Sequence, residues 1–148
     1  MKIAVTGHRD VRLGGQKEEV KMWLKEQLIN LKACYKDICL YDGMAKGVDQ
    51  IAAQTAISLG VPLECFFAYR RKLNDFEQHL IENADSITWL YDEYPGKYAY
   101  LERDRRMVDE CDMLLVVWDG IETGGTYYTY KYAQEKGKKI LMYAWRLK

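Results

Sequence analysis

The 148-residue sequence has no excess of charge of either sign, because 22 lysine and arginine residues balance 22 aspartate and glutamate residues. A protein that binds nucleic acid without sequence preference usually carries a basic excess that neutralises phosphates. The balanced charge therefore argues against nucleic acid as a partner, but it leaves open a local basic patch where Arg70, Arg71 and Lys72 adjoin, or at Arg105 and Arg106. A disordered chain is also excluded, because 49% of the residues are hydrophobic and only two are proline.

Metal-binding and membrane-spanning patterns are equally scarce. The four cysteines include no C-x-x-C pair, and the sequence has only two histidines. We therefore expect no metal site and no cofactor, and we predict the reduced cysteines of a cytoplasmic protein. No apolar run approaches the roughly 18 residues of a membrane helix, and the start MKIAVTGHRD turns polar too early for a signal peptide. The sequence predicts a soluble protein with no membrane partner.

Six short apolar runs are present, and helical patterns separate them. Several of the runs lack alternation, which is typical of strands buried on both faces of a parallel sheet. This order predicts an α/β fold, a Rossmann-like three-layer structure with a mostly parallel central sheet of about six strands, built as one domain over residues 1–148. The predicted strands are 2–6, 38–41, 63–67, 86–90, 113–118 and 139–143, and the helical patterns cover 20–31, 48–59, 75–83, 100–110 and 127–136.

The residues that directly follow each strand are the first candidates for a site, because such folds bind ligands beyond the carboxyl ends of their strands. Gly7, His8 and Arg9 follow the first strand. Gly7 permits a tight turn, and Arg9 offers a fork of donors to a phosphate or carboxylate. His8 either packs or acts as a general acid. The G-x-G-x-x-G fingerprint of dinucleotide-binding folds is absent.

Two small-residue loops stand before helices at the same predicted sheet edge. In the first loop, Asp49 is expected to orient the backbone by accepting its N–H groups. Either loop alone is compatible with an ordinary turn, but two at one edge favour a cradle for a phosphate or a ribose. The ligand-binding candidates are Gly43, Met44, Ala45 and Lys46 in the first loop, and Gly124, Gly125 and Thr126 in the second.

Two longer stretches resemble a known superfamily. The stretch GMAKGVDQIAAQTAISLG at 43–60 resembles the signature of the SLOG superfamily, which includes DNA-processing protein A and the lonely-guy phosphoribohydrolases. The stretch YLERDRRMVDECDMLLVVWDGIETGGT at 100–126 is similar to that superfamily's second half. With GHR at 7–9, the order resembles a small branch with a G-[HY]-R start, found in bacteria and phages. The resemblance implies a nucleotide-like ligand and a homodimer or higher homo-oligomer.

The resemblance also implies roles for single residues. In the phosphoribohydrolases an E-R-K-x-x-M segment supplies an arginine to the ligand, and Arg103 stands at that position here, with Asp104 in place of the lysine. Their P-G-G-x-G-T-x-x-E loop ends in a glutamate that acts at the sugar, but Thr129 stands there. Cleavage of an N-glycosidic bond develops positive charge that a carboxylate stabilises, so this loss favours binding over hydrolysis. Asp119 and Glu122 are nearby carboxylates and the two candidates for that role, although their spacing assigns it to neither.

Three functions follow from these patterns. The first is a module that binds a nucleotide or nucleotide-derived ligand, ADP-ribose-like or a cyclic signal, as a sensor or sequestering protein. The second is a nucleoside monophosphate phosphoribohydrolase or a sugar-transferring enzyme. The third is single-stranded DNA binding, by analogy with DNA-processing protein A, which ranks last because the chain is electrically neutral.

Overall fold

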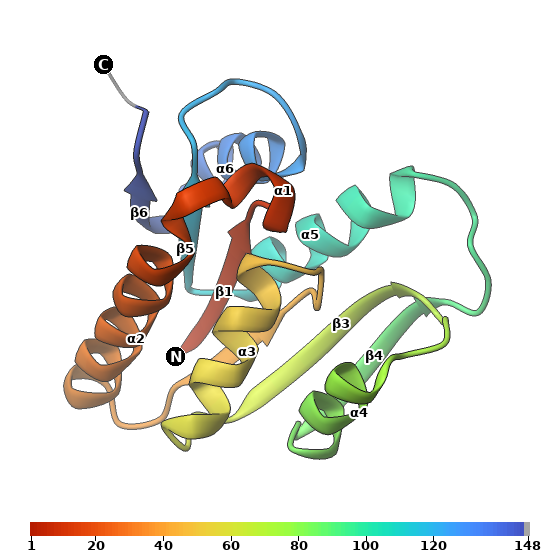
Figure 1. Ribbon diagram of the computed structural model, residues 1–148, viewed down its shortest axis with the longest axis horizontal. Coiled ribbons are helices and arrows are strands. Elements are labelled where there is room, and N and C mark those ends of the chain that lie inside the picture. The colour runs from red at the N-terminus through yellow and green to blue at the C-terminus, as the bar shows by residue number, and fades with distance from the viewer. Residues whose placement is uncertain (147–148) are drawn as a thin grey trace.

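The computed structural model describes residues 1–146 and contains six strands in alternation with helices (Figure 1). In chain order the elements are β1 (Lys2–Gly7), α1 (Asp10–Leu13), η1 (Gly14–Gln16), α2 (Lys17–Cys34), β2 (Cys39–Asp42), α3 (Val48–Ser58), β3 (Leu63–Tyr69), α4 (Asp75–Glu82), β4 (Ser86–Tyr91), α5 (Tyr98–Glu110), β5 (Met113–Trp118), α6 (Gly125–Glu135) and β6 (Lys139–Ala144).

The six strands form one sheet in the order β4-β3-β2-β1-β5-β6, and every pairing in it is parallel. The predicted α/β, Rossmann-like fold is confirmed. Strands β2 to β4 lie on one side of β1, whereas β5 and β6 lie on its other side. The connections after β1 and β5 therefore diverge at a topological switch point, where such folds bind their ligands.

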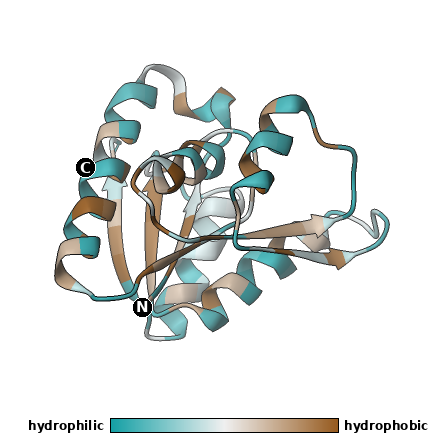
Figure 2. Cartoon of the chain, turned by 90° about the horizontal axis from the view of Figure 1, so that it is seen from below, coloured by the Kyte–Doolittle hydropathy of each residue, from teal (hydrophilic) through white to brown (hydrophobic). Residues whose placement is uncertain are grey.

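Helices cover both faces of the sheet, and alternate strand residues point into two apolar clusters. Ile3 and Val5 of β1 pack in the larger cluster with residues of α2 and α3. Ala4, between them, faces the other cluster, which contains residues of α5 and α6. All six residues of β5 are buried, as expected for a strand covered on both faces. Figure 2 shows this pattern as mostly brown central strands between helices that carry both colours.

Several element bounds differ from the expectations. The sequence did not predict α1, a helix of four residues whose position depends on tertiary contacts described below. Helix α6 begins at Gly125, two residues before the expected start, and Gly124 precedes it with a φ of 93°. Tyr130 of α6 is half-buried and packs at the edge of the smaller cluster. No helix among residues 1–146 is long and apolar enough to cross a membrane.

Candidate functional site

A cavity of about 470 Å³ opens beyond the carboxyl ends of the strands, and we call it the main cavity. Segments far apart in the sequence meet there, including the loop after β1, the start of α3, one side of α5 and the start of α6. Of the predicted ligand-binding residues, the main cavity is lined by Gly7, His8, Arg9, Ala45, Arg103, Gly125 and Thr126.

The start of α6 presents free backbone to the main cavity. Gly124, with its positive φ, precedes the helix, and no side chain of residues 1–146 caps the first N–H groups. A Cβ built on Gly125 would meet no atom within 4 Å, so this glycine leaves space next to the helix terminus. A helix N-terminus carries about half a positive charge and donors that point outward. This end of the cavity is suited to an anion.

Gly7 has a packing role in addition to its place in the cavity wall. A Cβ at this position would lie 2.5 Å from the Cβ of Val48, so only glycine allows β1 and α3 to approach this closely. Gly47 has a comparable role, because its Cβ would lie 2.5 Å from the main-chain oxygen of His8. The loops after β1 and β2 are therefore packed directly against each other.

Arg103 is buried, with 7% of its surface exposed. Its guanidinium donates from Nη1 to the main-chain oxygen of Gly43 at 2.8 Å and from Nε to Asp104 at 3.1 Å. Burial alone would lower the pKa of Arg103, but the carboxylates of Asp104, Asp49 and Asp42 raise it. Arg103 thus joins α5 to the loop after β2 and compensates a cluster of acidic groups inside the protein.

Asp42 and Asp49 bind backbone N–H groups of the loop after β2. Asp42 accepts the N–H of Met44 at 2.8 Å, and Asp49 accepts the N–H of Ala45 at 3.2 Å, which is the kind of contact expected of Asp49. One carboxylate oxygen of each aspartate is buried with no hydrogen-bond partner among the described residues. Burial raises the pKa of Asp49 to about 7, and burial with the neighbouring Asp49 raises the pKa of Asp42 well above its ordinary range.

The raised pKa of Asp49 predicts a pH-dependent stability. In the unfolded chain this carboxyl titrates at about pH 4, whereas in the folded protein its pKa is about 7. Between these two pH values the folded state binds the proton more tightly than the unfolded chain. The stability that this proton contributes is therefore complete below about pH 4 and is lost as the pH rises to about 7. The free energy of unfolding, measured with urea, should fall with pH between about pH 5 and pH 7 in the wild type. In Asp49→Asn this fall should be less steep, by up to about 1.4 kcal/mol per pH unit.

The matched control for this experiment is Asp92→Asn, because the Asp92 side chain is 94% exposed. This variant should follow the wild-type pH profile. If the profiles of wild type and Asp49→Asn are parallel, the carboxyl of Asp49 does not titrate in this range.

Asp119, a candidate catalytic carboxylate, is bound by other side chains. Arg12 donates to it from Nε at 3.0 Å and from Nη2 at 2.7 Å, and the N–H of Ile121 donates at 2.9 Å. Interactions with Ile121, Arg12 and His8 lower the pKa of Asp119 in spite of burial, so it is a fixed anion. Neither Asp119 nor Glu122 is among the described residues that line the main cavity. Asp119 anchors Arg12, and thereby the unpredicted helix α1.

His8 lies in the wall of the main cavity and is buried. Its Nε2 accepts the main-chain N–H of Asp119 at 3.0 Å, which assigns the ring proton to Nδ1. Burial and the nearby Arg12 lower the pKa of His8, although Asp119 opposes this effect. A neutral imidazole that already accepts at Nε2 is suited to packing and to loop support, rather than to proton donation.

Thr129, which stands at the motif position of the glutamate in the resembling hydrolases, contacts Asp104. The Thr129 hydroxyl lies 2.8 Å from the main-chain oxygen of Gly125 and 3.2 Å from Oδ2 of Asp104. Asp104 lines the main cavity together with Asp49. A carboxylate is therefore present beside position 129, although it comes from α5 and not from α6. The only sequence signal for it was the replacement of lysine by aspartate after Arg103.

A second cleft of about 220 Å³ adjoins the main cavity. Four lining residues belong to both, namely Arg9, Ala45, Tyr100 and Arg103. The second cleft contains the remaining candidates of the first loop, Gly43, Met44 and Lys46, whereas Gly124 lines neither space.

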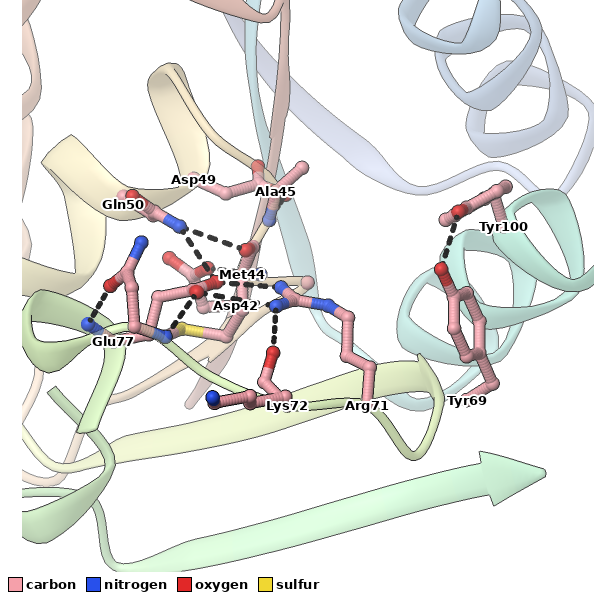
Figure 3. A network of polar contacts seen from close by, with 12 residues as sticks. Asp42, Met44, Ala45, Asp49, Gln50, Tyr69, Arg71, Lys72, Glu77 and Tyr100 are labelled. Carbon is pink, nitrogen blue, oxygen red and sulfur yellow. Dashed lines mark hydrogen bonds and ion pairs between the residues drawn. The ribbon is translucent and has the colours of Figure 1, made fainter. Parts of the chain in front are cut away.

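Arg71, at the second cleft, was not predicted as a site residue. Figure 3 shows its side chain pointing toward the loop that carries Met44, where Glu77 binds it at 3.2 and 2.6 Å. Glu77 is buried and also accepts from Gln50, whose amide reaches the main-chain oxygen of Met44. The sequence signal was local, because Asn74 and Glu77 form the capping box of α4. The contact between Glu77 and Arg71 is visible only in three dimensions.

Comparison with models of known protein families identifies the family of this chain. A family model described as the YspA SLOG family matches residues 3–147. The chain belongs to the YspA SLOG family. This membership confirms the resemblance to the SLOG superfamily inferred from the two sequence stretches. A comparison with curated proteins gives no match.

Solved structures share the fold at low sequence identity. DNA processing protein A from Streptococcus pneumoniae has a TM-score of 0.75 and 18% identity over 95% of this chain, which spans 49% of the pneumococcal protein. The Helicobacter pylori protein of that name, solved for its single-stranded DNA binding mode, has a TM-score of 0.70 and 18% identity over 96% of this chain and 64% of that one. A molybdenum cofactor carrier protein from Chlamydomonas reinhardtii has a TM-score of 0.64 and 16% identity over 95% of this chain and 74% of that one.

Proposed function

We propose that residues 1–148 act as one module that binds a nucleotide or nucleotide-derived ligand in the main cavity. The observation that carries this proposal is the uncapped start of α6 at Gly125, which opens on the cavity with space for an anion beside it. Family membership supports the proposal, because the SLOG superfamily, as noted above, includes proteins that act on nucleotides.

The polar groups of the main cavity suit the phosphate and the ribose of a nucleotide. A phosphate accepts N–H groups from the start of α6 and from Arg9, whose guanidinium lies over the Tyr100 ring at 5.6 Å and has no ion pair within residues 1–146. Ribose hydroxyls are donors, and the cavity offers them the carboxylates of Asp104 and Asp49. The unpartnered buried oxygen of Asp49 would gain a hydrogen bond from such a donor.

A ligand with an ADP-ribose-like or cyclic structure, held by a sensor or sequestering protein, fits this donor and acceptor pattern. Binding without turnover is favoured because Thr129 cannot provide the charge of the glutamate in the resembling hydrolases.

Hydrolysis of a nucleoside monophosphate is the second candidate function, and the position of Asp104 favours it. This carboxylate contacts Thr129 and lines the cavity, so it is better placed than Asp119 or Glu122 to stabilise positive charge on a sugar. Its pairing with Arg103 at 3.1 Å offsets part of its charge.

A panel of purine and pyrimidine nucleotides tests the two candidates. We expect saturable binding by isothermal titration calorimetry, and no release of free base when the protein is incubated with nucleoside monophosphates and the products are separated by chromatography. Base release at about one turnover per second or faster would assign the protein to the hydrolases. In that case Asp104→Asn should abolish the reaction. The absence of binding to every nucleotide would overturn the proposed function.

A further inference from the structure

The second cleft differs in charge from the main cavity. Carboxylates line the main cavity, whereas no carboxylate is among the described residues that line the second cleft. Its cations come from separate segments of the chain: Arg9 after β1, Lys46 before α3, Arg71 after β3, and Arg103 of α5, which is paired with Asp104. Positive charges that face one small space repel one another and together create a positive potential. An anion in the cleft would reduce this repulsion, so the cleft is suited to bind one.

Two of these cations form no ion pair within residues 1–146. Arg9 and Lys46 are exposed, and neither forms an ion pair with another residue of the described chain, 1–146. The functional groups of both residues are therefore free to bind a ligand. Arg9 lines both spaces, so one ligand that extends across the boundary meets it from either side.

The third cation, Arg71, is held in a defined position. Its terminal nitrogens donate to Glu77 and to the main-chain oxygen of Lys72. A guanidinium has five N–H donors. The Nε donor and one donor of Nη2 have no hydrogen-bond partner among residues 1–146. Because Glu77 is buried and bonded to Gln50, it fixes the guanidinium that faces the cleft.

Aromatic side chains form another part of the cleft. Tyr69 and Tyr100 line it, and their hydroxyls lie 3.2 Å apart. Phe67 also lines it, but its ring is buried and stacked on Trp89. Nucleobases stack on such rings, and each stacked base contributes about 1–3 kcal/mol to binding. Cations beside aromatic rings are the combination that recognises a nucleotide unit, with its phosphate and its base.

We propose that the second cleft binds the second nucleotide unit of a ligand whose first unit occupies the main cavity. The ligand class is therefore a dinucleotide with two separate phosphoryl groups, one at the start of α6 and one at Lys46 and Arg71, with Arg9 between them. This inference rests on the proposed function and names the ligand class of the same site.

The test compares adenosine 5′-monophosphate with the linear dinucleotide 5′-phosphoadenylyl-adenosine by calorimetry. We expect the dinucleotide to bind at least about tenfold more tightly, because it adds charged contacts in the second cleft. Lys46→Met should remove about tenfold of the dinucleotide affinity and leave the monophosphate affinity unchanged. Lys72→Met is the matched control, because Lys72 is an exposed lysine near the cleft that does not line it.

Arg71→Gln provides an independent variant, because glutamine keeps amide donors for Glu77 while it removes the positive charge. It should weaken binding of the dinucleotide selectively. Because buried Glu77 loses its cationic partner, the variant should also unfold more easily, so both probes are titrated well below its unfolding transition. Equal affinities of the two probes, or equal losses for both in Lys46→Met, would overturn the second subsite while the proposed function stands. If neither probe binds, both proposals fail.

An oligothymidylate of about eight nucleotides distinguishes a small dinucleotide from single-stranded DNA. We expect it to bind no more tightly than the dinucleotide, because the chain has no net charge to attract a longer polyanion. An affinity that increases with oligonucleotide length, and falls steeply with salt, would overturn the dinucleotide proposal in favour of DNA binding.

Discussion

Replacement of Arg103 by methionine should lower the free energy of unfolding by about 3–5 kcal/mol, the usual cost of removing one partner from a buried ion pair. Arg103 is the cation among Asp42, Asp49 and Asp104, and without it these carboxylates lose their compensating charge. The oxygen of Gly43 also loses its donor. Urea unfolding at about pH 8 measures the effect.

The loss of unfolding free energy in Arg103→Met should be smaller at about pH 5.5 than at pH 8. The pKa values of Asp42 and Asp49 are raised by burial in the wild type, and removal of Arg103 raises them further, so protonation relieves the repulsion at lower pH. Arg105→Met is the matched control, because Arg105 is exposed on the same helix, and it should change stability by less than about 0.5 kcal/mol. A loss below about 1 kcal/mol, or one independent of pH, would contradict the compensating role of Arg103.

The second large effect is on binding. Gly125→Val should lower the affinity for a nucleotide by at least about 100-fold, which corresponds to about 2.7 kcal/mol. The valine methyl groups would occupy the space beside the α6 terminus where a phosphate accepts its N–H groups. The fold should persist, because the backbone of Gly125 is not in the left-handed region and its Cβ would contact no neighbour. Calorimetry and far-ultraviolet circular dichroism check the two expectations.

Gly15→Val is the control for this substitution. Gly15 is another exposed glycine whose Cβ would meet no atom within 4 Å, and it does not line the main cavity. This variant should bind as the wild type does. Unchanged nucleotide affinity in Gly125→Val would show that the start of α6 does not hold the phosphate.

The strand and helix pattern was readable from the sequence because it depends on local order. The run MLLVVW in β5 is apolar on both faces, and such a run has one stable location, inside a parallel sheet. Helix α3 begins and ends close to the expected bounds because glycine precedes it and follows it at 47 and 60. The position of the site at the strand ends followed from this alternation.

Other features depended on residues that are distant in the sequence. Helix α1 has only four residues, too few to be stable alone, and Arg12 fixes it through Asp119, 107 residues away. Asp119 was a catalytic candidate because it stands near the glycine loop, but its partners give it a structural role. Asp104 was read as a lost lysine, whereas the structure places its carboxylate in the main cavity.

The sequence by itself determined the α/β class, the parallel sheet, the family and the loops that surround the site, because periodicity, glycine positions and motif order are local properties. The tertiary structure decided which polar groups line the main cavity, which are used inside the protein and how the candidate site divides into two spaces. Charges such as those of Arg103 and Arg71 take their roles from partners on other elements, and those distances exist only after the sheet has brought the strand ends together.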